Sequence, residues 1–251
     1  MAGGEGVIIT LLTDFGTADS YVAEMKGVLL SRAPHATLVD ISHQIDPGDI
    51  RAGQYLLERT WRRFPEGTVH LAVVDPGVGS SRRAIAADSS SHRFVAPDNG
   101  LLSFLHEGAR FVSLAVPTHA SPTFHGRDVF APVAAALADG AALDALGTLI
   151  IDPYQTPIPA AQHDGTTVVG EVIHIDRFGT LVSNIPARVV EPGVRIRVGD
   201  TDIGPLSRTF RDVARGVLVA FVGSGGTVEI AVRDGSAARM LGVGVGAEVR
   251  A

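Results

Sequence analysis

Short apolar runs alternate with helix-like stretches along the first 150 residues. Three of these runs predict strands, at residues 7–12, 37–41 and 69–74, and the run at 71–74 is continuous enough to predict burial on both faces. Between the first two runs, Val22, Met25 and Leu29 share one face of a predicted helix, and a second helix is expected to start at 47–49. This alternation predicts an α/β domain with a central, mostly parallel sheet, spanning residues 1–150.

Shorter elements complete this domain. Short strands are expected at 84–87, 94–96 and 111–114. A short helix is predicted at 101–105. A helix made almost entirely of alanine and apolar residues is predicted at 129–138. Such a smooth helix is typical of a packing element, and we assign it no function.

The pattern changes after residue 150. Residues 151–165 contain three prolines and no periodicity, which is typical of a linker. Beyond them, short runs rich in valine and isoleucine are separated by glycine turns, at 168–175, 195–198, 217–222 and 228–232. These runs predict a small, all-β, barrel-like domain over residues 166–251.

Composition narrows the class of protein. With 45% hydrophobic and 19% charged residues, the 251-residue chain is expected to be globular, with a sizeable core. A net charge of −6 without any long basic block argues against a nucleic-acid partner. No cysteine is present, which excludes disulfides, thiolate nucleophiles and cysteine metal sites. No membrane-spanning or leader-like stretch is evident, so we expect a cytoplasmic protein without a membrane partner.

The third apolar run ends in the richest candidate site. Asp75 follows it directly, Gly77 and Gly79 come next, and Arg82 and Arg83 close the loop. Ligands of open α/β sheets bind at the carboxyl ends of the strands, and glycines let a backbone approach a ligand closely. The combination favours a ligand site over the alternative, a solvated turn.

Asp14 follows the first apolar run and is therefore expected at the same sheet edge as Asp75. A carboxylate there can accept two hydrogen bonds from the vicinal diol of a ribose. The alternative is a helix N-cap, although Asp19 and Ser20 can also serve that role.

The sequence offers little support for a metal site or a nucleoside triphosphate site. His125 lies in a loop before the alanine-rich helix and could in principle join Asp14 and Asp75 around a metal. No His-x-His or His-x-x-x-His spacing supports such a site, so we expect no metal and no other cofactor. The loop at 77–82 lacks the Gly-Lys-Ser/Thr ending of a phosphate loop, which argues against a nucleoside triphosphatase.

Two turns of the predicted β domain also attract attention. Residues 176–180 read as a hairpin turn, but Phe178 at its tip needs a ligand or neighbour to cover it. The loop 223–226 has a bare backbone that can hydrogen-bond a flat base edge.

Together, these motifs resemble one family, the S-adenosylmethionine hydroxide adenosyltransferases (adenosine-forming S-adenosylmethionine hydrolases), which are related to fluorinating and chlorinating enzymes. The resemblance covers nearly the whole chain in order. It rests on LLTDFG (11–16), VVDPGVGSSRR (73–83), APDNG (96–100), TFHGRDVFAP (123–132), IDRFGTLVSNI (175–185) and EIAVRDGSAARMLG (229–242).

The resemblance implies hydrolysis of S-adenosyl-L-methionine to adenosine and L-methionine, by attack of water or hydroxide on the ribose C5′ carbon. The family's catalytic set falls on Asp75, Arg82 and His125. Its substrate-binding residues fall on Asp14, Asp19, Phe124, Asp176, Phe178, Asn184 and Ser224. The family also implies a homotrimer whose sites lie between the α/β domain of one subunit and the β domain of the next.

Two alternatives remain open. A halide-using adenosyl transferase is disfavoured because that branch carries Tyr at position 75 and Tyr-Ser at 125–126, and because a carboxylate at 75 would repel an anion. A non-catalytic protein that binds adenosine or S-adenosylmethionine is the other. The chain departs from the family at Gly223, where asparagine is more usual, so the contact made by that loop stays open.

Overall fold

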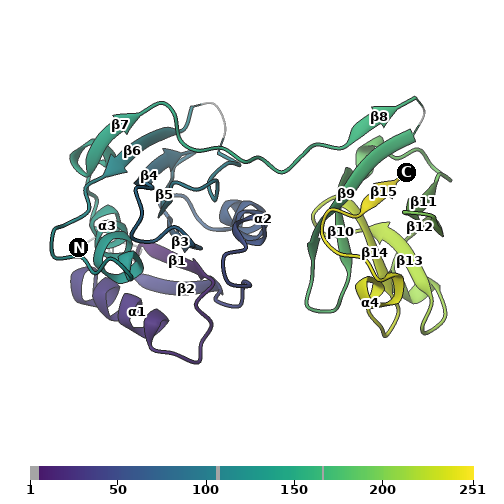
Figure 1. Ribbon diagram of the computed structural model, residues 1–251, viewed down its shortest axis with the longest axis horizontal. Helices are drawn as coiled ribbons and strands as arrows, with labels where there is room; N and C mark the ends of the chain where they lie inside the picture. The colour runs from purple at the N-terminus through teal and green to yellow at the C-terminus, as the bar shows by residue number, and fades with distance from the viewer. Residues whose placement is uncertain (1–5, 106–107, 166) are drawn as a thin grey trace. The chain divides into compact units, whose positions relative to one another are not determined.

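The computed structural model describes residues 6–105, 108–165 and 167–251. The chain forms two compact units, Met1–Pro157 and Ile158–Ala251 (Figure 1). The boundary falls within the 151–165 segment that the prolines mark in the sequence. None of the described helices is both long and apolar enough to cross a membrane.

A mixed seven-stranded sheet forms the first unit, in the order β2-β1-β3-β5-β4-β6-β7. Its strands are β1 (Ile8–Thr13), β2 (Thr37–Ser42), β3 (Val69–Val73), β4 (Ala84–Ser89), β5 (His92–Pro97), β6 (Arg110–Leu114) and β7 (Gly147–Ile150). β2, β1, β3 and β5 are parallel, whereas β4, β6 and β7 pair antiparallel. The predicted α/β class is confirmed, with the parallel strands confined to one side of the sheet.

The antiparallel part begins at a tight hairpin between β4 and β5. Its two central residues, Ser90 and Ser91, have φ values of 49° and 62°. Two successive positive φ angles are the signature of a type I′ turn, whose twist matches paired antiparallel strands. Serine is unusual at the central positions of a type I′ turn, which is why this hairpin was not predicted from the sequence.

Helices cover both faces of the sheet (Figure 1). α1 (Tyr21–Arg32) and α3 (Ala131–Ala138) bury Met25, Leu29 and the alanines of α3 against one face. α2 (Ile50–Thr60) packs Leu57 on the other face, together with Trp61 of the short helix η1 (Trp61–Arg63). The remaining short helices of this unit are η2 (Gly126–Phe130) and η3 (Leu143–Ala145). The packing role expected for α3 is confirmed.

The predicted helix at 101–105 is wrong. The segment forms successive turns, in which Ser103 N donates to Gly100 O at 3.0 Å and Leu105 N donates to Leu102 O at 3.0 Å. Leu101, Leu102 and Leu105 are all buried in the core below α2, so their burial rather than a helical repeat explains the apolar pattern.

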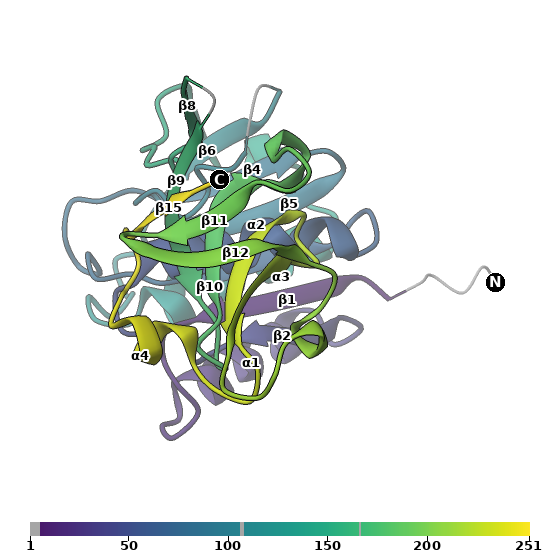
Figure 2. The same cartoon turned by 90° about the vertical axis from the view of Figure 1, so that its right-hand side faces the viewer.

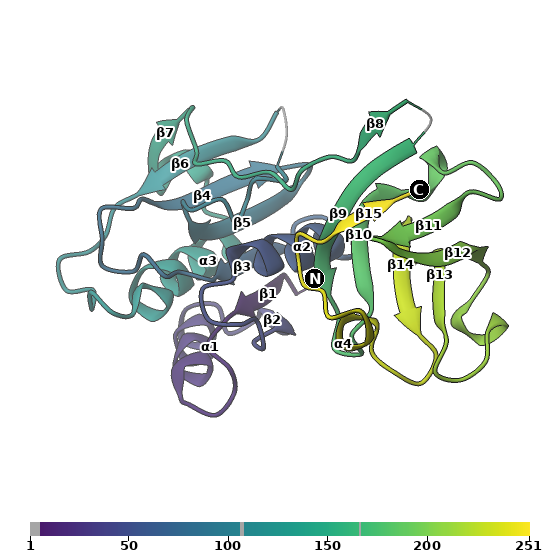
Figure 3. The same ribbon diagram turned by 45° about the vertical axis from the view of Figure 1, so that its right-hand side comes forward.

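The second unit is a closed β-barrel, as predicted. Its strands are β9 (Thr167–Ile175), β10 (Leu181–Pro186), β11 (Arg195–Val198), β12 (Thr201–Ser207), β13 (Leu218–Val222), β14 (Thr227–Val232) and β15 (Glu248–Arg250). They follow the order β10-β14-β13-β12-β11-β15-β9, and pairing of β9 with β10 closes the ring. Figure 2 shows β11 beside β12, and Figure 3 shows β9 beside β10. Outside the ring are β8 (Gln162–Asp164), which pairs with β9, α4 (Ala237–Leu241), η4 (Ala187–Val189) and η5 (Phe210–Asp212).

A buried histidine pair crosses the sheet of the first unit. His70 is 0% exposed, and its Nδ1 lies 2.8 Å from Thr10 Oγ1 while its Nε2 lies 3.1 Å from His92 Nδ1. The His70 ring stacks on Phe94 with centroids 5.0 Å apart. Burial lowers the pKa of His70 from 6.5 to about 3. The folded protein therefore holds His70 neutral under conditions in which the unfolded chain protonates it.

This pair predicts acid sensitivity of the fold. Folding depresses the pKa of His70, so keeping this histidine neutral lowers the free energy of unfolding in acid. The loss is absent above pH 6.5 and grows as pH falls toward 3, by up to about 1.4 kcal/mol per pH unit. Urea denaturation of His70→Gln between pH 7 and 4 is expected to give a shallower fall in unfolding free energy than wild type. The exposed His163→Gln provides the control. Equal slopes for His70→Gln and wild type would contradict this assignment.

A candidate active site at the edge of the sheet

Asp14 and Asp75 follow adjacent parallel strands at the same end. β1 and β3 pair with Thr13 opposite Val73, so both strands finish at one edge of the sheet. The expected shared edge is therefore confirmed. Asp14 Oδ2 accepts a hydrogen bond from Gly48 N at 2.8 Å. The N-cap of α1 is Ser20, so Asp14 is not the cap of that helix.

Asp75 and Arg82 form a buried, two-pronged ion pair. Arg82 Nε donates to Asp75 Oδ1 at 2.9 Å, and Arg82 Nη2 donates to Asp75 Oδ2. Their side chains are 4% and 10% exposed for Asp75 and Arg82, respectively. Arg82 Nη1 also donates to the Arg83 carbonyl at 3.2 Å, and the guanidinium carbon lies 5.2 Å from the centre of the Phe130 ring. The loop thus fixes a permanent positive charge at the sheet edge.

His125 extends this pair into a chain of three. Its Nδ1 lies 3.0 Å from Arg82 Nη2, and the residue is 6% exposed. A guanidinium can only donate, so Nδ1 accepts and the neutral imidazole carries its hydrogen on Nε2. Burial, assisted by the charge of Arg82, lowers the pKa of His125. The imidazole is therefore neutral at physiological pH and presents an N–H donor at Nε2.

Two further side chains hold the loop 75–83, and the sequence analysis did not identify either as a site residue. Asn99 Nδ2 donates to the carbonyl of Val74, the residue before Asp75, at 2.8 Å. Asp98 Oδ2 accepts from Arg83 Nε at 2.7 Å, at the other end of the loop. Both residues follow β5, the next parallel strand. Their position at the same sheet edge was the signal that could have found them.

The other predicted residues of this unit lie near the carboxyl end of β1 or beside His125. Phe124 is 8% exposed and packs edge-on against Phe15 and Tyr21, with ring centroids 6.0 and 5.3 Å apart. Asp19 lies in the exposed segment before α1. The aromatic cluster thus anchors the segment that leads from Asp14 toward α1.

The predicted residues of the barrel lie in two hairpins and a strand. Asp176 Oδ1 accepts from Phe178 N at 2.9 Å and Thr180 N at 2.8 Å, which leaves the Phe178 side chain at the turn tip 78% exposed. Asn184 engages backbone on both sides, accepting from Glu171 N and donating to Pro159 O at 2.8 Å each. Ser224 lies in the tight turn between β13 and β14.

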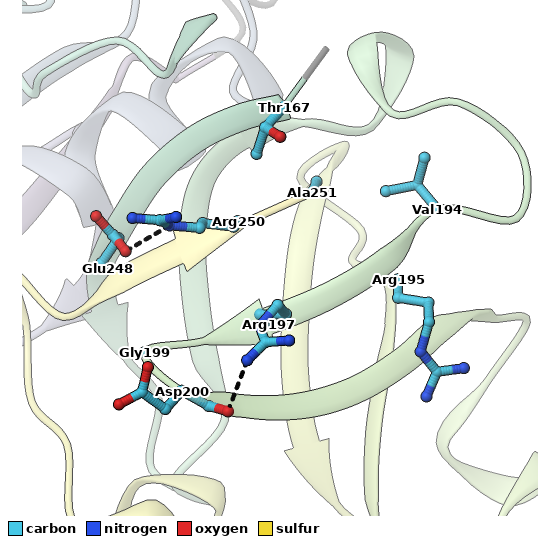
Figure 4. Close-up of a pocket in the computed structure, with 9 residues that line it drawn as sticks. All are labelled: Thr167, Val194, Arg195, Arg197, Gly199, Asp200, Glu248, Arg250 and Ala251. Atoms are coloured by element: carbon cyan, nitrogen blue, oxygen red, sulfur yellow. Dashed lines mark hydrogen bonds and ion pairs between the residues drawn. The ribbon is translucent and has the colours of Figure 1, made fainter. Parts of the chain in front are cut away.

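The structure also contains a hollow of about 640 Å³ on the barrel, which none of the predicted site residues lines (Figure 4). Three arginines border it; two of them are paired with carboxylates, and Arg197 Nη2 donates to the Asp200 carbonyl at 2.9 Å. Arg250 binds Glu248 at 2.7 Å and Arg195 binds Asp202 at 2.8 Å.

Among residues 6–105, 108–165 and 167–251, no group of three or more His, Asp or Glu side chains is placed to hold a metal ion.

An arginine-centred polar triad beside the strand ends of an α/β sheet, followed in the chain by a β-barrel, defines a two-domain α/β-plus-barrel protein. The chain belongs to the SAM hydroxide adenosyltransferase family. The family's N-terminal domain model matches residues 9–147, and its C-terminal domain model matches residues 170–250.

Relatives along nearly the full length agree. The chain is 41% identical to a Thermus thermophilus protein named (R)-S-adenosyl-L-methionine hydrolase, with 96% of this chain and 98% of the relative covered. It is 29% identical to a fluorinase from Nocardia brasiliensis, over 98% and 97% of the two chains. A crystal structure of an uncharacterized conserved protein from Thermotoga maritima superimposes with a TM-score of 0.90 at 36% identity, covering 96% of this chain and 98% of that one.

Proposed function

We propose that this protein hydrolyses S-adenosyl-L-methionine to adenosine and L-methionine by attack of water or hydroxide on the ribose C5′ carbon. The observation that carries this function is the chain of hydrogen bonds from Asp75 through Arg82 to His125 at the sheet edge. Full-length similarity to proteins named (R)-S-adenosyl-L-methionine hydrolase supports the same reaction.

The chemistry demands more at the nucleophile than at the leaving group. Methionine departs as a neutral thioether, so no acid has to protonate it. The water must be held in line with the C5′–S bond and stabilised as it becomes hydroxide-like. Arg82 supplies a permanent positive charge for that purpose, and Asp75 fixes the plane of the guanidinium.

His125 acts in this mechanism as a hydrogen-bond donor. Its Nδ1 is occupied by Arg82, and its Nε2 carries the hydrogen. A ring in this tautomer orients a water oxygen through Nε2–H but does not take a proton there. The proton of the attacking water therefore passes to solvent, and the charge of Arg82 holds the hydroxide that remains.

Two observations weigh against a halide as the nucleophile. Asp75 places a carboxylate beside the nucleophile, where it can accept a hydrogen bond from water but receives none from a halide. Position 126, which is serine in the halogenating branch, is glycine here, and a side chain at this position would be tightly packed. A Cβ added to Gly126 would lie 3.1 Å from Met25 Sδ and 3.2 Å from Phe124 Cε2.

A product assay separates the three readings of this site. Purified protein is incubated with S-adenosyl-L-methionine, with and without fluoride or chloride, and the products are separated by chromatography. Hydrolysis predicts adenosine and methionine in equal amounts, independent of halide. A 5′-halo-5′-deoxyadenosine would indicate the transferase instead, and binding without any product would indicate a non-catalytic binding protein.

Asp14 is assigned to the ribose hydroxyls, and this assignment predicts a binding defect. Removing its carboxylate leaves the diol without its acceptor in a closed site, at a cost of about 1–3 kcal/mol. Calorimetry with adenosine is expected to show affinity weaker by about 5- to 150-fold for Asp14→Ala. Asp144→Ala, in an exposed ion pair with Arg110, is the control. Near-normal affinity would leave Asp14 with only its support of Gly48.

We also infer a cyclic homotrimer with shared sites. The proposed site residues divide between the two units, with Asp14, Asp75, Arg82 and His125 in one and Asp176, Phe178, Asn184 and Ser224 in the other. Bound adenosine has to be covered against competing water, and the exposed Phe178 is suited to cover it. Head-to-tail contacts that close a ring give each subunit one complete site.

Complementation tests the sharing of sites. An Arg82→Ala subunit is mixed with an Asp176→Ala/Phe178→Ala subunit under conditions that exchange subunits, and native mass spectrometry reports the assembly. Shared sites predict that mixed trimers regain activity, because some interfaces unite two intact halves. No recovery in samples that have exchanged would show that each chain builds its own site.

A further inference from the structure

His125 stands at the start of a single π-helical turn, η2, which leads directly into α3. A π turn is rare and is frequently found at functional sites. Unlike Asp75, which follows a strand of the sheet, His125 is reached through a loop of turns at 117–125. The position of its ring therefore depends on what holds that loop.

Asp128 fastens the last turn of the loop. Its Oδ2 accepts a hydrogen bond from Ser121 N at 2.8 Å, and its backbone N donates to Phe124 O at 3.2 Å. Within the same turn, Phe124 N donates to Ser121 O at 3.1 Å. Asp128 thus binds both ends of the turn 121–124, which finishes at the residue before His125.

Arg127 locks Asp128 in place and ties it to α1. Its Nε and Nη2 bind the two oxygens of Asp128 at 2.7 and 3.0 Å, while Nη1 donates to Glu24 Oε2 of α1 at 2.8 Å. The guanidinium also lies over the ring of Phe124, with its carbon 4.9 Å from the ring centre. All three guanidinium nitrogens and one face of the group are therefore used to hold this segment.

The fastened turn meets the loop that carries Arg82. Gly79, in that loop, has a φ of +77°, and a Cβ added there would lie 2.5 Å from the carbonyl oxygen of Pro122. The two backbones approach so closely that a shift of the turn 121–124 would displace one loop against the other.

We propose that Arg127 and Asp128 are positioning residues, which hold the turn 121–124 between α1 and Gly79 so that His125 Nδ1 meets Arg82. Neither is assigned a contact with substrate. The proposal concerns catalysis only insofar as the hydrolysis proposed above holds, but the placement of His125 can be measured without substrate.

Positioning and simple electrostatics predict opposite changes in the titration of His125. Burial and Arg82 lower its pKa, whereas the negative charges of Asp75 and Asp128 raise it. If Asp128 acted only through its charge, neutralising it with the ring in place would lower the pKa of His125 further. If Asp128 holds the ring, its loss releases the ring from Arg82 and from its buried position, and the pKa rises toward the ordinary value.

The test uses the full-length Asp128→Asn variant, with Asp144→Asn as control, because Asp144 is an exposed carboxylate ion-paired with one arginine. NMR titration of labelled histidine in substrate-free protein is expected to show a raised pKa for His125. The kcat for adenosine formation is expected to fall about tenfold or more, a larger change than that in KM or in adenosine affinity.

Arg127→Gln provides a second route if Asp128→Asn does not fold, since it keeps the bond from Asp128 to Ser121 and is expected to shift both readouts in the same direction by less. An unchanged or lowered pKa of His125 in the folded variants would overturn the proposal, as would a loss confined to KM. If wild-type protein formed no adenosine, the proposed function would fail, while the titration of His125 would still decide the positioning role.

Discussion

Replacing Arg82 with alanine is expected to lower kcat for adenosine formation about a hundred- to a thousandfold, because it removes the fixed charge that stabilises the developing hydroxide. Affinity for adenosine should stay within about threefold, since Arg82 is assigned to the water and not to the nucleoside. Steady-state kinetics and calorimetry of the same preparation measure both quantities.

Arg82→Lys is the informative companion. It keeps a positive charge but not the planar fork that binds both oxygens of Asp75 and reaches His125. We expect an intermediate kcat. Arg195→Ala, on the outer surface of the barrel, is the control for loss of an arginine and should leave kcat unchanged. A kcat close to wild type in Arg82→Ala would remove Arg82 from the mechanism.

Asp75→Asn is expected to damage both catalysis and stability. It leaves the Arg82 guanidinium, only 10% exposed, without its carboxylate. Breaking one side of a buried pair costs about 3–5 kcal/mol of unfolding free energy, which urea denaturation measures. The kcat should fall about a hundredfold, because the guanidinium is no longer held in one plane.

A double variant separates these two effects. Asp75→Asn combined with Arg82→Ala removes the unpaired charge along with its partner, so part of the lost stability should return. Activity should not return, because the triad is then absent. A loss for the double variant equal to the sum of the losses of Asp75→Asn and Arg82→Ala would show that the pair contributes no coupling energy.

The strands β1 and β3 could be predicted from sequence because each contains a run of apolar residues, and their polar ends predicted the shared edge of Asp14 and Asp75. The Ser90–Ser91 hairpin could not be predicted, because serine does not favour the positive φ angles that this turn requires. The predicted helix at 101–105 failed for a related reason. Five residues are too few for burial and helical periodicity to be told apart.

The candidate site, too, could be predicted from the sequence only in part. The motifs pointed to Asp75, Arg82 and His125, whereas the tautomer of His125 follows only from the geometry of its bond to Arg82. The contacts of Asp128 and Arg127 could not be predicted from sequence, because their partners, Ser121 and Glu24, lie in a separate turn and a separate helix. Pairings of that kind depend on tertiary packing, which local sequence does not specify.

The most direct test of the account is the fate of the water oxygen. S-adenosyl-L-methionine is incubated with the protein in water enriched in ¹⁸O, and both products are analysed by mass spectrometry. Attack at the ribose C5′ predicts one ¹⁸O atom in the 5′-hydroxyl of adenosine and none in methionine. Adenosine without the label, or cleavage that places the label in the amino-acid product, would contradict attack of water at C5′.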